Sequence, residues 1–312
     1  MNAGMDEFEI IARYFAPLAG EGAFGLGDDA AVLPLRAGHD LAVTTDAIAA
    51  GTDFFADDPP GTVAQKALRV NLSDLAAKGA APAAYLLNLT LPRDVGEDWL
   101  AGFAQGLKHD QAEFAVSLLG GDTSASDGGL SIAVTAFGFV PQGRMLRRSG
   151  ARIGDHVYVT GTIGDSGGGL AVLRGAGHAL AAAARDSLVA RYRVPQPPVG
   201  FGAVHLLQIA HAGVDVSDGL IADLGHIASQ SGVAIVVDGA RVPLSDPVQA
   251  LWGADALVRA VTAGDDYQIA FTGPAGLNGP FTAIGHAEAG SGVRLMLDGR
   301  EVPIERPGFR HF

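Results

Sequence analysis

The chain has 312 residues, of which 48% are hydrophobic and 18% are charged, so it can bury one large core or two medium ones. A formal net charge of −13 argues against nucleic acid or an anionic membrane surface as a partner. The absence of cysteine excludes disulfides, zinc–thiolate sites, iron–sulfur clusters and a cysteine nucleophile. No signal-peptide pattern and no membrane-spanning apolar run is visible, so a cytoplasmic protein is expected.

Hydrophobic periodicity predicts an alternation of helices and strands in the first half of the chain. Helices are expected at 6–18, 62–79 and 99–109, and strands at 30–33, 41–45, 84–91, 115–119 and 130–140. A turn is expected at 120–122, between the last two strands. Thr62 and Gln65 have the spacing of a capping box, and Gly79 and Pro82 end the same helix.

The hydrophobic periodicity is interrupted near 147–154, where a polar and basic run predicts a linker. Beyond it, helices are expected at 164–173, 180–192, 199–211 and 220–231, and strands at 155–160, 214–216, 234–237, 267–271, 282–284 and 293–297. The elements mix without strict βαβ alternation, which favours an α+β fold with two α/β domains. The boundary is placed between 1–146 and 147–312.

Five acidic clusters carry the main chemical signal. Asn71 and Asp74 share one face of an otherwise apolar helix, although, for this helix taken alone, an ordinary exposed Asp74–Lys78 pair is the better explanation. The other four clusters stand at the ends of apolar or glycine-rich runs: Gly27-Asp28-Asp29, Thr44-Thr45-Asp46, Gly120-Gly121-Asp122 and Asp215-Val-Ser217-Asp218. Carboxylates that converge repel one another unless cations lie between them, and oxygen ligands suit Mg²⁺. A magnesium site is therefore the working hypothesis.

The sequence supports neither a serine nucleophile nor a Walker A nucleotide-binding loop. Gly164-Asp-Ser166-Gly-Gly168 matches the G-x-S-x-G pattern of a serine nucleophile, but no histidine stands in a recognisable partner context. A turn that holds an anion at a helix N-terminus, or a purely structural turn, explains it better. None of Lys66, Lys78 and Lys108 belongs to a Walker A loop.

The ordered set of motifs resembles the thiamine-monophosphate kinase family, within the aminoimidazole ribonucleotide synthetase superfamily. The resemblance covers nearly the whole chain. Besides the five acidic clusters it includes Arg148-Ser-Gly-Ala-Arg-Ile-Gly-Asp155, Gly264-Asp265-Asp266-Tyr267 and the closing Gly308-Phe309-Arg-His-Phe312. Each motif is weak alone, but their order is specific.

The resemblance implies transfer of the ATP γ-phosphoryl group to thiamine monophosphate, giving thiamine diphosphate, with no covalent nucleophile. It implies several Mg²⁺ ions held by Asp29, Thr44, Thr45, Asp46, Asp74, Asp122, Asp215 and Asp218. ATP would contact Gly121, Asp122, Arg148 and Ser217, and thiamine monophosphate would contact Asp53, Asp265 and Phe309. A homodimer that pairs the N-terminal sheets is also implied. Nucleic acid and membrane partners are not expected.

Two positions depart from the family's pattern. Asp53 stands where the family usually has His, and Asp265 replaces the usual Glu and is one methylene shorter. Both departures fall among the residues expected to contact thiamine monophosphate, the acceptor of the phosphoryl group. Two alternatives remain open: another ATP-dependent enzyme of the same superfamily, similar to aminoimidazole ribonucleotide synthetase, and a non-catalytic protein that binds Mg²⁺ and nucleotide.

Overall fold

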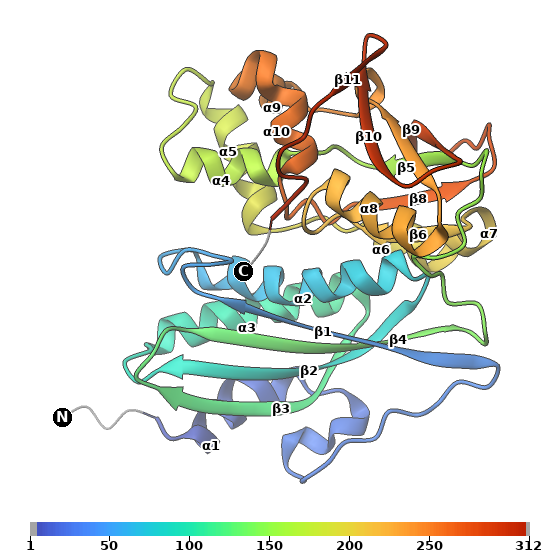
Figure 1. Ribbon diagram of the computed structural model, residues 1–312. Coiled ribbons are helices and arrows are strands. Elements are labelled where there is room, and N and C mark those ends of the chain that lie inside the picture. The colour runs from blue at the N-terminus through green and yellow to red at the C-terminus, as the bar shows by residue number, and fades with distance from the viewer. Residues whose placement is uncertain (1–4, 310–312) are drawn as a thin grey trace. The chain divides into compact units, whose positions relative to one another are not determined.

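The computed structural model describes residues 5–309 (Figure 1). The chain divides into two compact units, the first from Met1–Leu75 and Ala80–Gly143, the second from Ala76–Gly79 and Arg144–Phe312. Each unit combines helices with one main sheet, which confirms the expected α+β class. Within residues 5–309, no helix is both long and apolar enough to cross a membrane.

The first unit contains a four-stranded sheet in the order β1-β4-β2-β3. β4 is antiparallel to both β1 and β2, whereas β2 and β3 are parallel. In Figure 1, α2 and α3 lie along one face of this sheet. The elements are α1 (Glu7–Ile10), β1 (His39–Ala49), α2 (Pro60–Ala77), β2 (Ala81–Pro92), α3 (Glu97–Phe114), β3 (Ser117–Ser126) and β4 (Ser131–Pro141).

Helices α2 and α3 pack closely because glycines line their contact. A Cβ added at Gly106 would lie 2.2 Å from the carbonyl oxygen of Gly61, so only glycine permits this approach. α2 begins at Pro60 rather than at the expected Thr62. The Thr62 hydroxyl donates to the carbonyl oxygen of Pro59 at 2.7 Å, and so contributes to the first turn instead of capping it from outside.

A buried ion pair also joins these two helices. Arg69, which is 2% exposed, donates to both carboxylate oxygens of Asp110 at 2.8 Å and to Glu113 at 2.6 Å. Removing one partner of such a pair strands a buried charge and costs roughly 3–5 kcal/mol. Because Asn71 and Asp74 follow Arg69 on the same helix, the pair also fixes the helix that carries them.

Three local expectations in the first unit were wrong. Residues 30–33 form no strand, because Val32 donates its N–H to Gly22 at 2.8 Å and pairs with the preceding turn. Residues 120–122 are not a turn but lie inside β3, where a Cβ at Gly121 would come within 1.8 Å of the carbonyl oxygen of Leu87. That glycine therefore serves close strand approach. The helix expected at 6–18 is divided into α, π and 3₁₀ segments, and Phe8 in its first part is 77% exposed.

The second unit contains a seven-stranded mixed sheet in the order β11-β10-β7-β9-β5-β8-β6. Its strands are β5 (His156–Thr160), β6 (Ala212–Asp215), β7 (Ala234–Asp238), β8 (Ile269–Gly273), β9 (Phe281–Glu288), β10 (Gly292–Leu297) and β11 (Arg300–Val302). Its helices are α4 (Asp165–Leu173), α5 (Ala182–Arg193), α6 (Val199–Phe201), α7 (Leu207–Ile209), α8 (Leu220–Ser231), α9 (Asp246–Trp252) and α10 (Ala256–Thr262). α8 has the predicted bounds, whereas α9, α10 and β11 were not predicted.

The segment Ala76–Gly79 belongs to the second unit although it completes and follows α2. The carbonyl oxygen of Lys78 accepts the N–H of Leu146 at 3.1 Å, and its Nζ donates to the carbonyl oxygen of Gly213 at 2.9 Å. A Cβ at Gly202 would lie 2.3 Å from the carbonyl oxygen of Ala76. The second unit therefore incorporates four residues from the first half of the chain.

Candidate functional site

In the first unit, β1 and α2 bring several predicted site residues together. Thr44 Oγ1 donates to Asp74 Oδ2 at 2.5 Å, and the backbone N–H of Asp46 donates to Asn71 Oδ1 at 3.0 Å. The Asn71 amide is fully buried and also donates to the carbonyl oxygen of Ala67 at 3.1 Å. Asn71 and Asp74, which share one face of α2, thus contact Asp46 and Thr44, two alternate residues of β1. The Asp46 side chain remains exposed.

Thr45 lies on the other face of β1 from Thr44, because successive strand side chains alternate. Its hydroxyl donates to the carbonyl oxygen of Val134 at 3.1 Å and lies 3.0 Å from Thr135 Oγ1. The predicted metal-ligating hydroxyls therefore point in opposite directions. The role of Thr45 stays a prediction.

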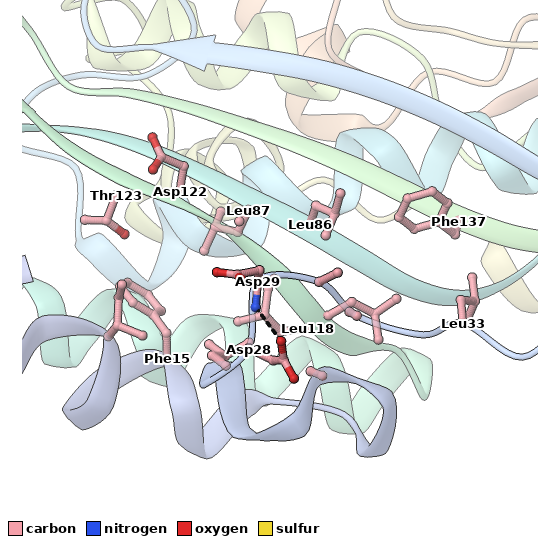
Figure 2. Close-up of a pocket in the computed structure, with 18 of the residues that line it drawn as sticks. Phe15, Asp28, Asp29, Leu33, Leu86, Leu87, Leu118, Asp122, Thr123 and Phe137 are labelled. Carbon is pink, nitrogen blue, oxygen red and sulfur yellow. Dashed lines mark hydrogen bonds between the residues drawn. The ribbon is translucent and has the colours of Figure 1, made fainter. Parts of the chain in front are cut away.

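A pocket of about 460 Å³ lies in the first unit (Figure 2). Its wall is largely apolar and includes Phe15, Leu33, Leu86, Leu118 and Phe137. Asp28, Asp29, Asp122 and Thr123 supply its polar side chains, and Gly121 lines it with backbone; the N–H of Asp29 donates to Asp28 Oδ1 at 2.8 Å. An apolar cavity with a few carboxylates at its margin suits a ligand that has both a planar ring and a cation-bound anionic part.

The predicted carboxylates of this unit do not form one tight group in the described residues. No three of Asp29, Asp46, Asp74 and Asp122 place one carboxylate oxygen each within 4.8 Å of one another. The structure therefore pairs Thr44 with Asp74 beside Asp46, and places Asp29 and Asp122 at the pocket. Hard oxygen ligands predominate in both places, which is the donor chemistry that Mg²⁺ prefers.

In the second unit, a turn from β6 into α8 carries Asp215, Ser217 and Asp218. Asp215 is buried, whereas Ser217 and Asp218 are half-buried. Asp223, in the first turn of α8, accepts the backbone N–H groups of Ser217, Asp218 and Gly219 on one oxygen, each at 3.1 Å. This single buried carboxylate thus fixes the backbone of the turn.

Electrostatics at this turn are dominated by burial. Burial, together with the negative charge of Asp218, raises the pKa of Asp223 to about 7, although its three N–H donors oppose the shift. His226 offers a ring nitrogen within 4.8 Å of carboxylate oxygens of Asp218 and Asp223. Burial and the charge of Arg148 lower the pKa of His226, and Asp218 opposes this. Arg148 therefore acts electrostatically at the same turn as Ser217 and Asp218.

Asp223 and His226 were not predicted from the sequence. An acidic residue in the first turn of a helix that follows glycine was the available signal for Asp223. For His226 the only signal was its place one helical turn beyond Asp223, which is too common a spacing to be informative.

Two residues that were predicted to contact thiamine monophosphate form hydrogen bonds with this turn. The N–H of Asp265 donates to the carbonyl oxygen of Ser217 at 2.8 Å, and the N–H of Phe309 donates to that of Asp218 at 2.9 Å. Phe309 is 52% exposed, so its ring is accessible to a ligand. Arg310, His311 and Phe312 of the closing motif lie outside the described residues. The structure therefore gathers Ser217, Asp218, Asp265 and Phe309.

Asp53 occupies the turn after β1 and is half-buried. Its Oδ2 accepts the N–H of Ala49 at 2.8 Å, and its carbonyl oxygen accepts a hydrogen bond from Lys66 Nζ at 2.7 Å. The side chain is thus engaged in the turn rather than directed only to solvent.

The glycine-rich turn at 164–168 begins α4, as expected, but two of its amide groups are already bound to a side chain of the protein. Asp266 accepts the N–H groups of Gly164 at 2.7 Å and of Ser166 at 3.3 Å. Ser166 itself is 1% exposed, so a substrate has no access to its hydroxyl. An internal carboxylate therefore takes the place that an external anion would occupy.

Family models of known proteins match both halves of the chain. The N-terminal domain of AIR synthase related protein matches residues 27–140, and the C-terminal domain of AIR synthase related protein matches residues 152–298. Thiamine-monophosphate kinase of Escherichia coli strain K12 is 41% identical over 322 residues, which cover 98% of each chain.

Solved structures agree. Thiamine-monophosphate kinase from Stenotrophomonas maltophilia K279a is 41% identical with a TM-score of 0.81, covering 89% of this chain and 91% of that one. AaThiL complexed with AMPPCP and TMP is 33% identical, also with a TM-score of 0.81, covering 93% of this chain and 97% of that one. Since the likeness extends over both units, the chain belongs to the thiamine-monophosphate kinase family of AIR synthase related proteins.

Proposed function

We propose that this protein transfers the γ-phosphoryl group of ATP directly to the phosphate of thiamine monophosphate, forming thiamine diphosphate and ADP. The observation that carries the proposal is similarity over nearly the full chain to thiamine-monophosphate kinases, one of them solved with an ATP analogue and TMP. Both reactants are anions, and the described residues around the candidate positions supply many carboxylates. The chemistry therefore requires positioning and neutralisation of charge rather than a covalent nucleophile.

The proposed nucleotide contacts are Gly121, Asp122, Arg148 and Ser217. Gly121 and Asp122 line the pocket, whose apolar wall suits the adenine ring. Arg148 and Ser217 complete the proposed ATP contacts. A guanidinium neutralises phosphate charge, and a hydroxyl or N–H donates to phosphate oxygen.

Several Mg²⁺ ions are assigned to the carboxylates. The proposed ligands are Asp29, Thr44, Thr45, Asp46, Asp74 and Asp122 in the first unit, and Asp215 and Asp218 in the second. Their oxygen donors fit a hard cation, and Asp46 and Asp122 are exposed enough to receive one. When bound, the ions neutralise phosphate charge and orient the transferred group. The chain's own contribution is to hold Asp74 against Thr44, and Asp46 through Asn71.

Thiamine monophosphate is assigned to Asp53, Asp265 and Phe309. The thiazolium ring is cationic, so a carboxylate and an exposed aromatic face suit it. Support comes from the contacts of Asp265 and Phe309 with the backbone of the turn that bears Ser217 and Asp218.

The active form is proposed to be a cytoplasmic homodimer in which the N-terminal sheets pair. Strand β1 is an edge of its sheet, and two of its apolar residues, Leu41 and Val43, are 37% and 56% exposed. Such an edge is normally covered. Sedimentation at micromolar concentration is expected to give a dimer, and a fully active monomer would contradict this assignment.

A coupled ADP-release assay tests the function. Thiamine monophosphate, thiamine and aminoimidazole precursors are compared side by side, each with ATP and Mg²⁺. Rapid turnover is expected with thiamine monophosphate alone. Turnover that favours an aminoimidazole precursor would assign the chain to another activity of the superfamily, and ATP binding without turnover of any of them would indicate a non-catalytic nucleotide-binding protein.

A further inference from the structure

The turn that carries Asp265 has an unusual backbone. Asp265 has a φ of +68° and Tyr267 a φ of +51°, so two residues with side chains adopt the left-handed conformation on either side of Asp266. Aspartate tolerates this conformation, whereas tyrosine rarely adopts it. A backbone of this kind persists only where the surrounding structure holds it.

Asp266 supplies the anchor. Its side chain is 2% exposed, and each of its carboxylate oxygens accepts a different amide from the start of α4: Oδ2 from Gly164 at 2.7 Å and Oδ1 from Ser166 at 3.3 Å. Gly164 is the N-cap of α4 and has no side chain to cap the helix. Asp266 therefore caps α4 from a distant segment of the chain.

The anchor point is itself rigid. A Cβ at Gly164 would lie 2.5 Å from Cβ of Ala260, and one at Gly167 would lie 2.4 Å from Cβ of Ala263. The first turn of α4 thus packs directly on the end of α10, with no room to shift. A carboxylate bound to this turn holds its own backbone in a fixed place.

The remaining contacts direct Asp265 itself. Its N–H donates to Ser217, and the N–H of Tyr267 donates to the carbonyl oxygen of Val216 at 2.8 Å. The Tyr267 hydroxyl donates to Asp265 Oδ1 at 3.2 Å. The backbone and the carboxylate of Asp265 are therefore both oriented before any ligand arrives.

We infer that Asp266 is a positioning residue for acceptor binding: it locks the turn to α4, and Tyr267 then orients the Asp265 carboxylate toward thiamine monophosphate. This inference rests on the proposed function, which assigns Asp265 to the acceptor. Preorganisation of this kind strengthens binding because the ligand does not have to order the turn. ATP binding should depend less on this carboxylate, because Asp223 holds the turn of Ser217 independently through three backbone N–H groups.

Asp266→Asn is the sharpest variant, because asparagine has the same size but only its Oδ1 can accept a hydrogen bond, whereas both oxygens of the Asp266 carboxyl group can accept whether or not it is protonated. One of the two α4 amides then faces an NH₂ group, which loosens the turn. We expect KM for thiamine monophosphate to rise by about fivefold to tenfold, with KM for ATP changed by less than about twofold. The matched control is Asp238→Asn, since Asp238 also accepts a backbone N–H, that of Ala240, but at an exposed position. This control is expected to leave both constants unchanged.

Asp265→Ala and the double variant separate the inference from the function on which it rests. If Asp266 acts through Asp265, adding Asp266→Asn to Asp265→Ala changes KM for thiamine monophosphate no further. A rise in Asp265→Ala without one in Asp266→Asn would overturn the inference alone, as would additive effects or equal rises for both substrates. No rise in Asp265→Ala would overturn the acceptor assignment as well.

Tyr267→Phe keeps the test decisive if Asp266→Asn does not fold. It preserves the ring and removes only the hydroxyl that donates to Asp265. A smaller, selective rise in KM for thiamine monophosphate is expected, of about twofold to threefold. Unchanged constants in a folded Tyr267→Phe protein would overturn the inference.

Discussion

The two units hold their candidate site residues in different ways. In the first unit, side chains on a long strand and a long helix contact one another, as Thr44 does Asp74. In the second unit, the site residues lie on short turns that are held by buried carboxylates. Asp223 accepts the N–H groups of one turn, and Asp266 links its own turn to the start of α4. Regular elements position a side chain through their own hydrogen bonds, whereas a turn needs an external anchor.

The difference predicts two kinds of failure. Exposed carboxylates of the first unit, such as Asp46 and Asp122, can lose charge without disturbing the fold. A buried anchor of the second unit cannot be removed without freeing the backbone that it holds. Substitutions in the two units should therefore separate chemistry from geometry.

The largest effect is expected for Asp46→Asn or Asp122→Asn. Either change removes a proposed metal-ligating charge, and kcat should fall by about 100-fold or more while the melting curve stays unchanged. Asp57→Asn, at an exposed loop position, is the control and should keep full activity. Near-normal turnover in both site variants would disprove the shared metal role.

Asp223→Ala should damage geometry and stability together. Three backbone N–H groups lose their acceptor, which costs about 1–3 kcal/mol of unfolding free energy even though relief of a buried charge offsets part of it. Activity should fall by about tenfold to 100-fold, because Ser217 and Asp218 lose their fixed backbone. Chemical denaturation and steady-state kinetics measure the two effects, with the exposed Asp186→Ala as control. Full activity together with lowered stability would remove the turn from the site.

Substitutions at Asp53 test its proposed contact with thiamine monophosphate. Asp53→Ala should raise KM for thiamine monophosphate about tenfold, the equivalent of roughly 1.4 kcal/mol, and change KM for ATP much less. Asp53→His restores the family's usual residue and should stay active.

Asp53→Asn is the matched comparison, because its amide oxygen can still accept the N–H of Ala49. If the alanine variant is impaired and the asparagine variant is normal, Asp53 supports the turn rather than the acceptor. Unchanged constants in all three variants would leave acceptor binding to Asp265 and Phe309.

The smallest effect on turnover is expected from the titration of Asp266. This titration should instead change the unfolding free energy of the protein. Burial raises the pKa of Asp266 from the ordinary aspartate value of 3.8 to about 8, outweighing the two amide donors. Between these values the folded protein keeps a proton that the unfolded chain releases. Its unfolding free energy therefore falls as pH rises from about 4 to about 8, by at most about 1.4 kcal/mol per pH unit from this group.

Asp266→Asn lacks this titration. Its stability relative to the parent protein should increase with pH across that window and level off above it, in denaturation curves recorded with a chelator present. A relative stability that is constant, or that falls with pH, would mean that the amide donors outweigh burial and that the carboxylate is ionised throughout.

Much of the fold followed from local signals. Periodicity and flanking glycines gave α8 its bounds at Leu220 and Ser231, and the apolar run at 84–91 lies within β2. Helical spacing also placed Asn71 and Asp74 on one face of α2, and the structure shows that both of them contact β1. These signals succeed because a short window contains all the residues that create them.

What failed depended on distant partners. Gly121 looks like a turn glycine, but its role is set by Leu87 on the neighbouring strand. Asp266 resembles any loop aspartate until α4 is placed beside it, and no pattern near residue 266 indicates that contact. The same holds for α9 and α10, whose short lengths give few periods on which to base a prediction.

The four residues at 76–79 have a consequence for dissection of the chain. A cut at 143/144 would leave the second unit without the segment whose backbone accepts the N–H of Leu146 and fills the space against Gly202. In the first fragment, the same cut would leave the end of α2 and Gly79 without the residues of the second unit that pack against them. We therefore expect neither half to complete its packing alone, because the second unit includes residues 76–79, which are synthesised much earlier. Fragment complementation, rather than separate expression, is the way to obtain the two halves folded.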